Sequence, residues 1–273
     1  MKIQTKQENA LIVGAQTTQF GLNLKDPSIF IQMLMNLYSD PIGSSVREYL
    51  SNAWDANKES GTDNPIVVGL DDNKFWIQDY GKGLSPEFMN SSEAGYCTIG
   101  YSTKRDSNEM IGAYGFGRMT FLAYNKSQYW VNTVYQGVAY EYLIFLDGNT
   151  IKQTLLSKKE TTEPSGTRVV VQLNKEWNEK GKWIAAIKEQ AQYFEGTLVS
   201  IDDKVSKVEV TKDYVWSSSL HSSSAHFVLG CVYYEIDWNH FQHWKNLEDY
   251  YGGIHIGLDE GIVPTPNRES LEN

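Results

Sequence analysis

Residues Ser44 to Gly61, SSVREYLSNAWDANKESG, carry the clearest structural signal in this sequence. Wound as a helix at about 100° per residue, it has one packed flank and a separate polar strip. The packed flank carries Val46, Leu50, Ala53 and Asn57. The polar strip carries Glu48, Asn52 and Asp55. Ser44 or Ser45 is the expected N-cap, and Gly61 is the expected end of the helix.

The polar strip suits a site for a metal ion and a phosphate. The amide oxygen of Asn52 can ligate a hard cation such as Mg²⁺, and the carboxylate of Glu48 can accept a proton from water. The alternative is an ordinary amphipathic helix with a solvated polar face, the usual arrangement at a protein surface. Motifs further along the chain favour the site.

The composition is that of a soluble globular protein. The 273 residues are 41% hydrophobic and 21% charged, and this length favours two domains over one. A formal charge of -10 argues against a sequence-independent nucleic-acid binder, although it leaves room for a local basic groove. The 2 cysteines make no disulfide framework, and neither a signal peptide nor a bilayer-spanning apolar run is visible. We therefore expect a cytoplasmic protein.

Other segments predict the elements around this helix. SIFIQMLMNLY (28–38) predicts a core helix, with Ile29, Met33 and Leu37 on one face and Phe30, Leu34 and Tyr38 beside it. PIVVGL (65–70) and KFWIQD (74–79) predict a β-hairpin. The polar residues 90–108 show no period and are too many for a simple connection, so they predict a functional segment.

The chain then becomes β-rich, in the segments SQYWVNTVY, GVAYEYLIFLDG, TIKQTLL and GTRVVVQL. These segments predict an α+β fold whose mixed sheet carries helices on one face. A new helical pattern, EWNEKGKWIAAIKEQAQYF, begins near residue 176. We therefore expect one domain over residues 1–175 and a second, smaller α+β domain over residues 176–273.

Four motifs follow one another in a characteristic order. The helix with Glu48 and Asn52 comes first, and the turn DYGKG, starting at Asp79, ends a strand. The glycine loop IGAYGFG (111–117) then precedes a short apolar run, and Gly-Thr (166–167) opens a later strand. This order resembles the GHKL nucleotide-binding superfamily, which includes DNA gyrase, MutL, the ninety-kilodalton heat-shock chaperone and histidine kinases. The resemblance implies a Bergerat-type α/β sandwich that binds ATP and Mg²⁺, followed by a transducer-like domain.

The resemblance assigns roles to the motif residues. The carboxylate of Asp79 would accept a hydrogen bond from the exocyclic amine of adenine, and Thr167 would support Asp79. Glycines bring the backbone close to the base, where a Cβ would collide, and loop N–H groups with a helix N-terminus face the phosphates. Asn52 would hold Mg²⁺, and Glu48 would polarise the attacking water. The remaining expected nucleotide contacts are Asp55, Ala56, Gly81, Gly83, Lys104, Gly112, Gly115, Phe116, Gly117 and Arg118.

Two of these contacts have ordinary alternatives. Lys104, in GYSTKR (100–105), and Arg118 could each reach a phosphate or simply be solvated or structural. His240 and His243 form an H-x-x-H pair without further evident ligands, so we expect no metal site beyond Mg²⁺. The sequence lacks G-x-x-x-x-G-K-[ST], and its glycine loop leads into β structure, which excludes a P-loop and a Rossmann unit.

The end of the sequence narrows the resemblance. PNRESLEN (266–273) is similar to a middle-domain segment of the ninety-kilodalton chaperone, in which an arginine reaches the γ-phosphate. Arg268 would take that catalytic role here. The whole chain looks most like the rIIA-like, rapid-lysis proteins of tailed bacteriophages, which are longer and imply a rIIB-like partner. One departure is Arg118-Met119-Thr120, where the family usually has a serine and a lysine.

The sequence thus predicts a slow, magnesium-dependent ATPase of a phage rIIA-like protein in the cytoplasm of an infected host cell. ATP would order a lid, formed by the polar segment 90–108, and would stabilise a homodimer. Hydrolysis would release both. One alternative is an interaction module that binds ATP without hydrolysing it. Another is a cellular ATPase related to the chaperones or topoisomerases.

Overall fold

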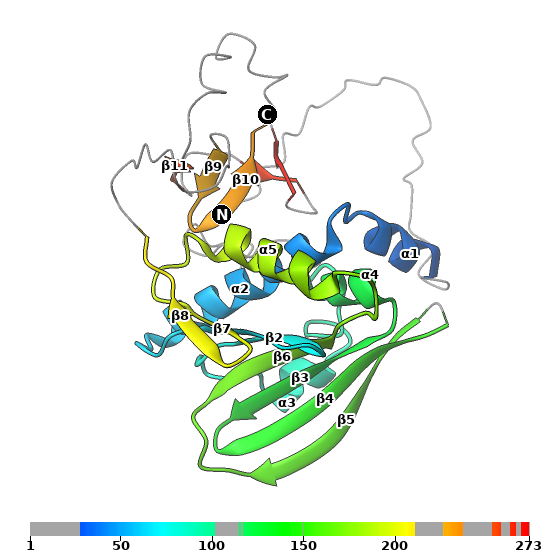
Figure 1. The fold of residues 1–273 in the computed structure, drawn as a ribbon. Helices are drawn as coiled ribbons and strands as arrows, with labels where there is room; N and C mark the ends of the chain where they lie inside the picture. The colour runs from blue at the N-terminus through cyan, green and yellow to red at the C-terminus, as the bar shows by residue number, and fades with distance from the viewer. Residues whose placement is uncertain are drawn as a thin grey trace, which may run out of the picture.

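The structure is a computed structural model that describes residues 28–101, 115, 117–148, 150–210, 226–236, 253–257, 263–265 and 269–272. Its main body is a sandwich of one large sheet and a layer of helices that covers one face of the sheet (Figure 1). The expected α+β fold, a mixed sheet with helices on one face, is confirmed.

The large sheet has eight strands in the order β5-β4-β3-β6-β2-β1-β7-β8. Neighbouring strands are antiparallel, except that β1 and β7 are parallel. The strands are β1 (Val67–Leu70), β2 (Lys74–Gln78), β3 (Gln128–Tyr135), β4 (Val138–Asp147), β5 (Thr150–Glu160), β6 (Gly166–Gln172), β7 (Leu198–Ile201) and β8 (Lys204–Lys207). The hairpin expected at residues 65–79 is the β1–β2 pair, so that prediction is confirmed.

The helices of the described chain are α1 (Ser28–Asn36), α2 (Pro41–Ser60), α3 (Pro86–Asn90), the 3₁₀ turn η1 (Gly117–Met119), α4 (Thr120–Asn125) and α5 (Glu179–Ala191). Helix α2 begins earlier than predicted, because Asp40 is its N-cap and accepts a hydrogen bond of 3.1 Å from the Gly43 N–H. Pro41 fits the first turn because it has no N–H to satisfy. Gly61 ends the helix with φ +65°, as expected.

Aromatic rings fill the core between the two layers. Tyr49 of α2 stacks on Phe121 of α4 with ring centres 4.1 Å apart, and Phe75 of β2 stacks on Trp183 of α5 at 4.3 Å. Offset stacking of this kind adds about 0.5–1.5 kcal/mol per pair to the burial of the rings. Trp183 is fully buried, so α5 is part of this core.

The sandwich continues past the domain boundary expected after residue 175. Helix α5 packs on α2, and the residues of β7 pair with those of β1, for example Val199 with Val68. Strand β8 then pairs with β7 at the edge of the sheet. The expected boundary therefore falls inside the sandwich. Strand β7 follows α5 and pairs in parallel with β1, so both elements after residue 175 belong to the same sheet and helix layer.

Helix α1 differs from the expected core helix. Ile29 and Met33, with 68% and 62% of their surface exposed, face solvent, and so does Leu37. The buried side chains are instead Ile31, Leu34 and Tyr38. Ile31 and Tyr38 pack with Met119 and Ala123, which follow the glycine loop. Only one side of this apolar helix is thus covered by the described residues.

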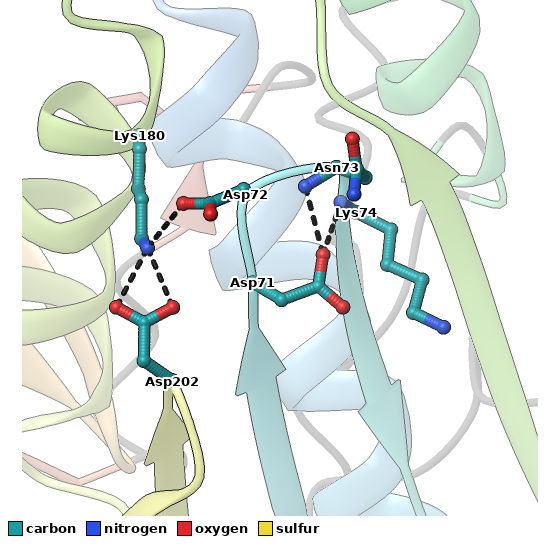
Figure 2. Close-up of polar contacts among 6 residues, drawn as sticks. All are labelled: Asp71, Asp72, Asn73, Lys74, Lys180 and Asp202. Atoms are coloured by element: carbon teal, nitrogen blue, oxygen red, sulfur yellow. Dashed lines mark hydrogen bonds and ion pairs between the residues drawn. The ribbon is translucent and has the colours of Figure 1, made fainter.

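A lysine ties the start of α5 to two turns of the sheet (Figure 2). The Lys180 ammonium lies 2.7 Å from Asp72, between β1 and β2, and 2.5 Å from Asp202, between β7 and β8. Hydrogen bonds to Asp202 and Asp72 raise the pKa of Lys180. In the same view, Asp71 accepts hydrogen bonds from the N–H groups of Asn73 and Lys74, which shapes the β1–β2 turn.

The C-terminal part forms two small sheets. Strand β9 (His226–Leu229) pairs with β10 (Val232–Glu235) and β11 (Gly253–Ile256), and β10 contacts α5. Strands β12 (Val263–Pro264) and β13 (Leu271–Glu272) form the second sheet. Within the described ranges, no helix combines the length and apolar character needed to cross a membrane.

Candidate functional site

A cavity of about 500 Å³ lies between α2, the end of β2 and the end of the glycine loop. Most of the residues predicted to contact a nucleotide line it. Those residues are Glu48, Asn52, Ala56, Asp79, Gly83, Gly115, Gly117, Arg118 and Thr167. The structure thus brings together, at one cavity, motifs that are more than one hundred positions apart, from Glu48 to Thr167.

Asp79 follows β2 directly and is buried, with 9% of its surface exposed. Its Oδ1 accepts hydrogen bonds from the N–H groups of Gly81, at 2.9 Å, and Thr167, at 3.1 Å. The Asp79 N–H in turn donates to the carbonyl oxygen of Thr167 at 2.9 Å. Two backbone donors therefore fix the orientation of a buried carboxylate at the cavity wall, and Thr167 supports Asp79 through its backbone.

The two glycines after Asp79 allow close packing within the protein. A Cβ at Gly81 would lie 2.9 Å from the carbonyl oxygen of Ala56 on α2. A Cβ at Gly83 would lie 2.1 Å from the carbonyl oxygen of Val134, and its φ of +77° is one that L-residues rarely adopt. Gly83 lines the cavity, whereas the described contact of Gly81 is with α2. Both glycines thus allow a close approach to neighbouring backbone, and the approach to a base stays a prediction.

Glu48 and Asn52 lie one turn apart on the cavity side of α2. Glu48 is buried, with 7% of its surface exposed, while Asn52 is exposed to the cavity. A Cβ added at Gly117 would lie 2.2 Å from Oε2 of Glu48, so the end of the glycine loop closes directly over this carboxylate. The arrangement places a potential base beside a potential metal ligand.

Asp55 does not join this site. It is fully buried and is absent from the cavity lining, although the polar strip predicted it beside Glu48 and Asn52. Burial, followed by the charge of Asp55, raises the pKa of Cys231 to about 11, which places Asp55 near the β9–β10 turn. The helical spacing did not predict this burial, because other elements, among them α4 and α5, cover more than one flank of α2.

Arg118 lines the cavity, but carbonyl oxygens surround its guanidinium group. It donates to the carbonyl oxygens of Gly95, Tyr96 and Tyr101, the first at 2.9 Å and the last at 2.8 Å. The Arg118 backbone carbonyl accepts a hydrogen bond of 3.3 Å from the Tyr49 hydroxyl. This side chain thus joins the glycine loop to the segment that follows α3.

Aromatic side chains line the cavity and were not predicted. They are Tyr49, Phe88, Tyr96, Tyr101 and Tyr135. Burial raises the pKa of both Tyr49 and Tyr96, so these hydroxyls stay neutral. Rings of this kind can pack against a planar base. No sequence motif indicates them, although Tyr96 and Tyr101 lie within the polar segment predicted to be functional.

Four predicted site residues lie outside the described residues: Lys104, Gly112, Phe116 and Arg268. His240 and His243 lie outside them as well. Across the ranges that the structure describes, no group of three or more His, Cys, Asp or Glu side chains could hold a metal ion.

No family model matches the chain, and no curated protein matches it. Among solved structures, the chain is similar to the ATPase region of Saccharomyces cerevisiae topoisomerase II, with a TM-score of 0.57 and 14% identity over 83% of this chain and 76% of that one. A second structure of that region, bound to ICRF-187 (dexrazoxane), matches with a TM-score of 0.56 and 14% identity over 84% of this chain and 77% of that one.

These similarities show that the chain shares the fold of the topoisomerase II ATPase region, an α+β fold of the kind that the order of its motifs predicted. The narrower resemblance to rIIA-like proteins is not tested by these comparisons and stays a prediction.

Proposed function

We propose that the cavity binds ATP with magnesium and hydrolyses it slowly. The observation that carries this proposal is the pairing of Asp79, fixed by two backbone amides, with Glu48 and Asn52 at the same cavity of about 500 Å³. That volume is within the usual range for small-molecule sites. The topoisomerase II ATPase regions, which share the fold, support the choice of ATP.

Each residue has a definite role in this proposal. Asp79 accepts a hydrogen bond from the exocyclic amine, which selects adenine over guanine. The amide oxygen of Asn52 fits Mg²⁺, which commonly takes one or two protein ligands together with phosphate oxygens and neutralises charge on them. Glu48 accepts the proton of the attacking water. Arg268 then supplies a guanidinium group to the γ-phosphate.

We assign the C-terminal strands to a transducer-like region that responds to the bound nucleotide. In this proposal ATP stabilises a homodimer, and hydrolysis would release it. We assign the dimer contact to the exposed side chains on α1, which are Ile29, Met33 and Leu37. Helix α1 packs beside Met119, just after the glycine loop, which supports such a link. Sedimentation with a non-hydrolysable ATP analogue tests this dimer. The wild type should dimerise, and Met33→Glu should stay monomeric.

The rIIA-like assignment rests on several shared sequence features: the N-terminal arm, VREYLSNAWDA (46–56), a short lid, IGAYGFG (111–117) and LDEGIVPTPNRESLEN (258–273). It implies a rIIB-like partner, a role in lysis inhibition and a location in the cytoplasm of the infected host. A cellular chaperone- or topoisomerase-related ATPase is the second candidate, favoured by the topoisomerase II fold. Trapping of a client protein or of DNA by the ATP-bound form would distinguish it from the first.

A non-catalytic, ATP-binding interaction module is the third candidate. Arg118-Met119-Thr120 favours it, because these residues stand where the family usually has a serine and a lysine. The guanidinium of Arg118 also binds carbonyl oxygens of the protein itself.

The test of the proposed function is calorimetric titration with a non-hydrolysable ATP analogue and magnesium, alongside a phosphate-release assay. In an ATPase, Glu48→Ala retains binding and loses turnover. Binding without turnover in the wild type selects the module, and absence of binding overturns the nucleotide site.

A further inference from the structure

Arg118 directly follows the glycine loop, and its contacts span the segment 95–101. Nη1 donates to the carbonyl oxygen of Gly95 at 2.9 Å and also to that of Tyr96, and Nη2 donates to that of Tyr101 at 2.8 Å. The guanidinium carbon lies 5.0 Å from the centre of the Tyr96 ring. One side chain therefore holds both ends of this segment.

The same two segments also touch through their backbones. The Gly100 N–H donates to the carbonyl oxygen of Gly115 at 3.3 Å. A Cβ at Gly115, where φ is +72°, would lie 2.4 Å from the carbonyl oxygen of Tyr101. Tyr96, Tyr101 and Gly115 all line the cavity. The segment 95–101 and the end of the glycine loop therefore form one continuous part of the cavity wall, and Arg118 fastens it.

The geometry of these hydrogen bonds limits how the Arg118 guanidinium could contact a phosphate. Its five N–H donors lie in one rigid plane, and three of them face the carbonyl oxygens of Gly95, Tyr96 and Tyr101, so most of the donor capacity of Arg118 is used within the protein. Hydrogen bonds from a charged donor are also stronger than neutral ones. We propose that Arg118 is a positioning residue that holds segment 95–101 against the glycine loop and so shapes the cavity, and that it is not a phosphate ligand.

This proposal rests on the proposed function only for the identity of the ligand, so its first test uses protein without nucleotide. Hydrogen exchange of the Tyr96 and Gly100 amides is measured in Arg118→Ala and Arg118→Lys. Loss of charged hydrogen bonds should speed exchange by about tenfold or more in both variants, because a lysine cannot reproduce the planar fork. Unchanged exchange in β3 and β6 shows that the fold is retained.

A matched control is Lys82→Ala. Lys82 also lines the cavity, but its ammonium pairs with Glu59 at 2.6 Å and no described contact joins it to segment 95–101. This control should leave exchange in that segment unchanged. Wild-type exchange in both Arg118 variants would overturn the proposal, since a residue that acts only on phosphate leaves the nucleotide-free protein unaffected.

The second test is calorimetric titration with ADP. Both Arg118 variants should lose affinity by a similar factor, about tenfold, because each loses the shaped wall. If Arg118→Lys binds ADP as tightly as the wild type, charge alone is sufficient and the proposal is wrong. If wild-type protein binds no ADP, the proposed function fails, while the exchange comparison still decides the role of Arg118.

Discussion

The carboxylate of Glu269 accepts a hydrogen bond of 3.1 Å from the hydroxyl of Ser44, 225 positions earlier in the chain. The same carboxylate accepts from the Ser39 hydroxyl at 2.7 Å and from the Asp40 N–H at 3.0 Å. The N-cap Asp40 already places a carboxylate at the N-terminus of α2, and Glu269 adds a second negative charge there. The C-terminal segment is thereby joined to the helix that carries Glu48 and Asn52.

Glu269→Ala should lower the free energy of unfolding by about 1–2 kcal/mol, because it removes hydrogen bonds to a charged group at a helix N-terminus. Urea denaturation measures the loss, and the Asp40 amide should exchange faster. Glu269→Gln, which keeps an acceptor oxygen, should lose less. The exposed Glu163→Ala is the control and should change stability little. An equal loss in both alanine variants would refute the contact.

Asp79→Asn separates folding from binding. The asparagine oxygen can still accept from the N–H groups of Gly81 and Thr167, so stability should change by no more than about 1 kcal/mol. The new amide group would then oppose the exocyclic amine of adenine, donor against donor. Calorimetry should show adenine-nucleotide affinity lower by about 100-fold or more. Retained affinity in a folded variant would contradict the assignment of Asp79 to adenine.

Gly117→Ala should strain the site, because the new Cβ would meet Oε2 of Glu48 at 2.2 Å. We expect a loss of about 1–3 kcal/mol in unfolding free energy and a strong fall in turnover. In a Glu48→Ala background the same substitution should cost less, since the clashing oxygens are gone. A double-mutant cycle by thermal unfolding measures the difference. Additive effects would mean that the loop does not close over Glu48.

Local patterns in the sequence predicted the parts of this fold that depend on near neighbours. The β1–β2 hairpin and α2 follow from alternation and helical spacing, and the spaced motifs placed Asp79 and Glu48 at one site. The pairing of β1 with β7 was missed because a parallel contact between distant segments leaves no local signature.

The side-chain environments could not be predicted in the same way. Asp55 has the helical phase of a site residue but is fully buried, because neighbouring elements cover its flank of α2. Met33 has the spacing of a core residue but is exposed, because the described chain covers only the other side of α1. Arg118 looks like a phosphate ligand by its position, yet three carbonyl oxygens from a distant turn surround it. Such contacts depend on tertiary packing.

The buried thiol of Cys231 should make the free energy of unfolding depend on pH in the alkaline range. Burial first, and then the charge of Asp55, raises the pKa of its thiol to about 11, above an ordinary value near 8.5. Below its ordinary pKa the thiol is protonated in both the folded and the unfolded state, so it adds nothing to the pH dependence of stability. As the pH rises from about 9 to 11, only the unfolded state loses the proton, so the free energy of unfolding falls and then levels off.

The measurement is urea denaturation of wild type and Cys231→Ala across this pH range. The tyrosines titrate in both proteins, so their contribution cancels in the difference. The wild type should lose about 2 kcal/mol more than the variant between pH 9 and 11, since each unit of pKa shift is worth about 1.4 kcal/mol and partial exposure reduces the sum. Parallel curves would mean that the thiol is not desolvated and that Asp55 does not face it.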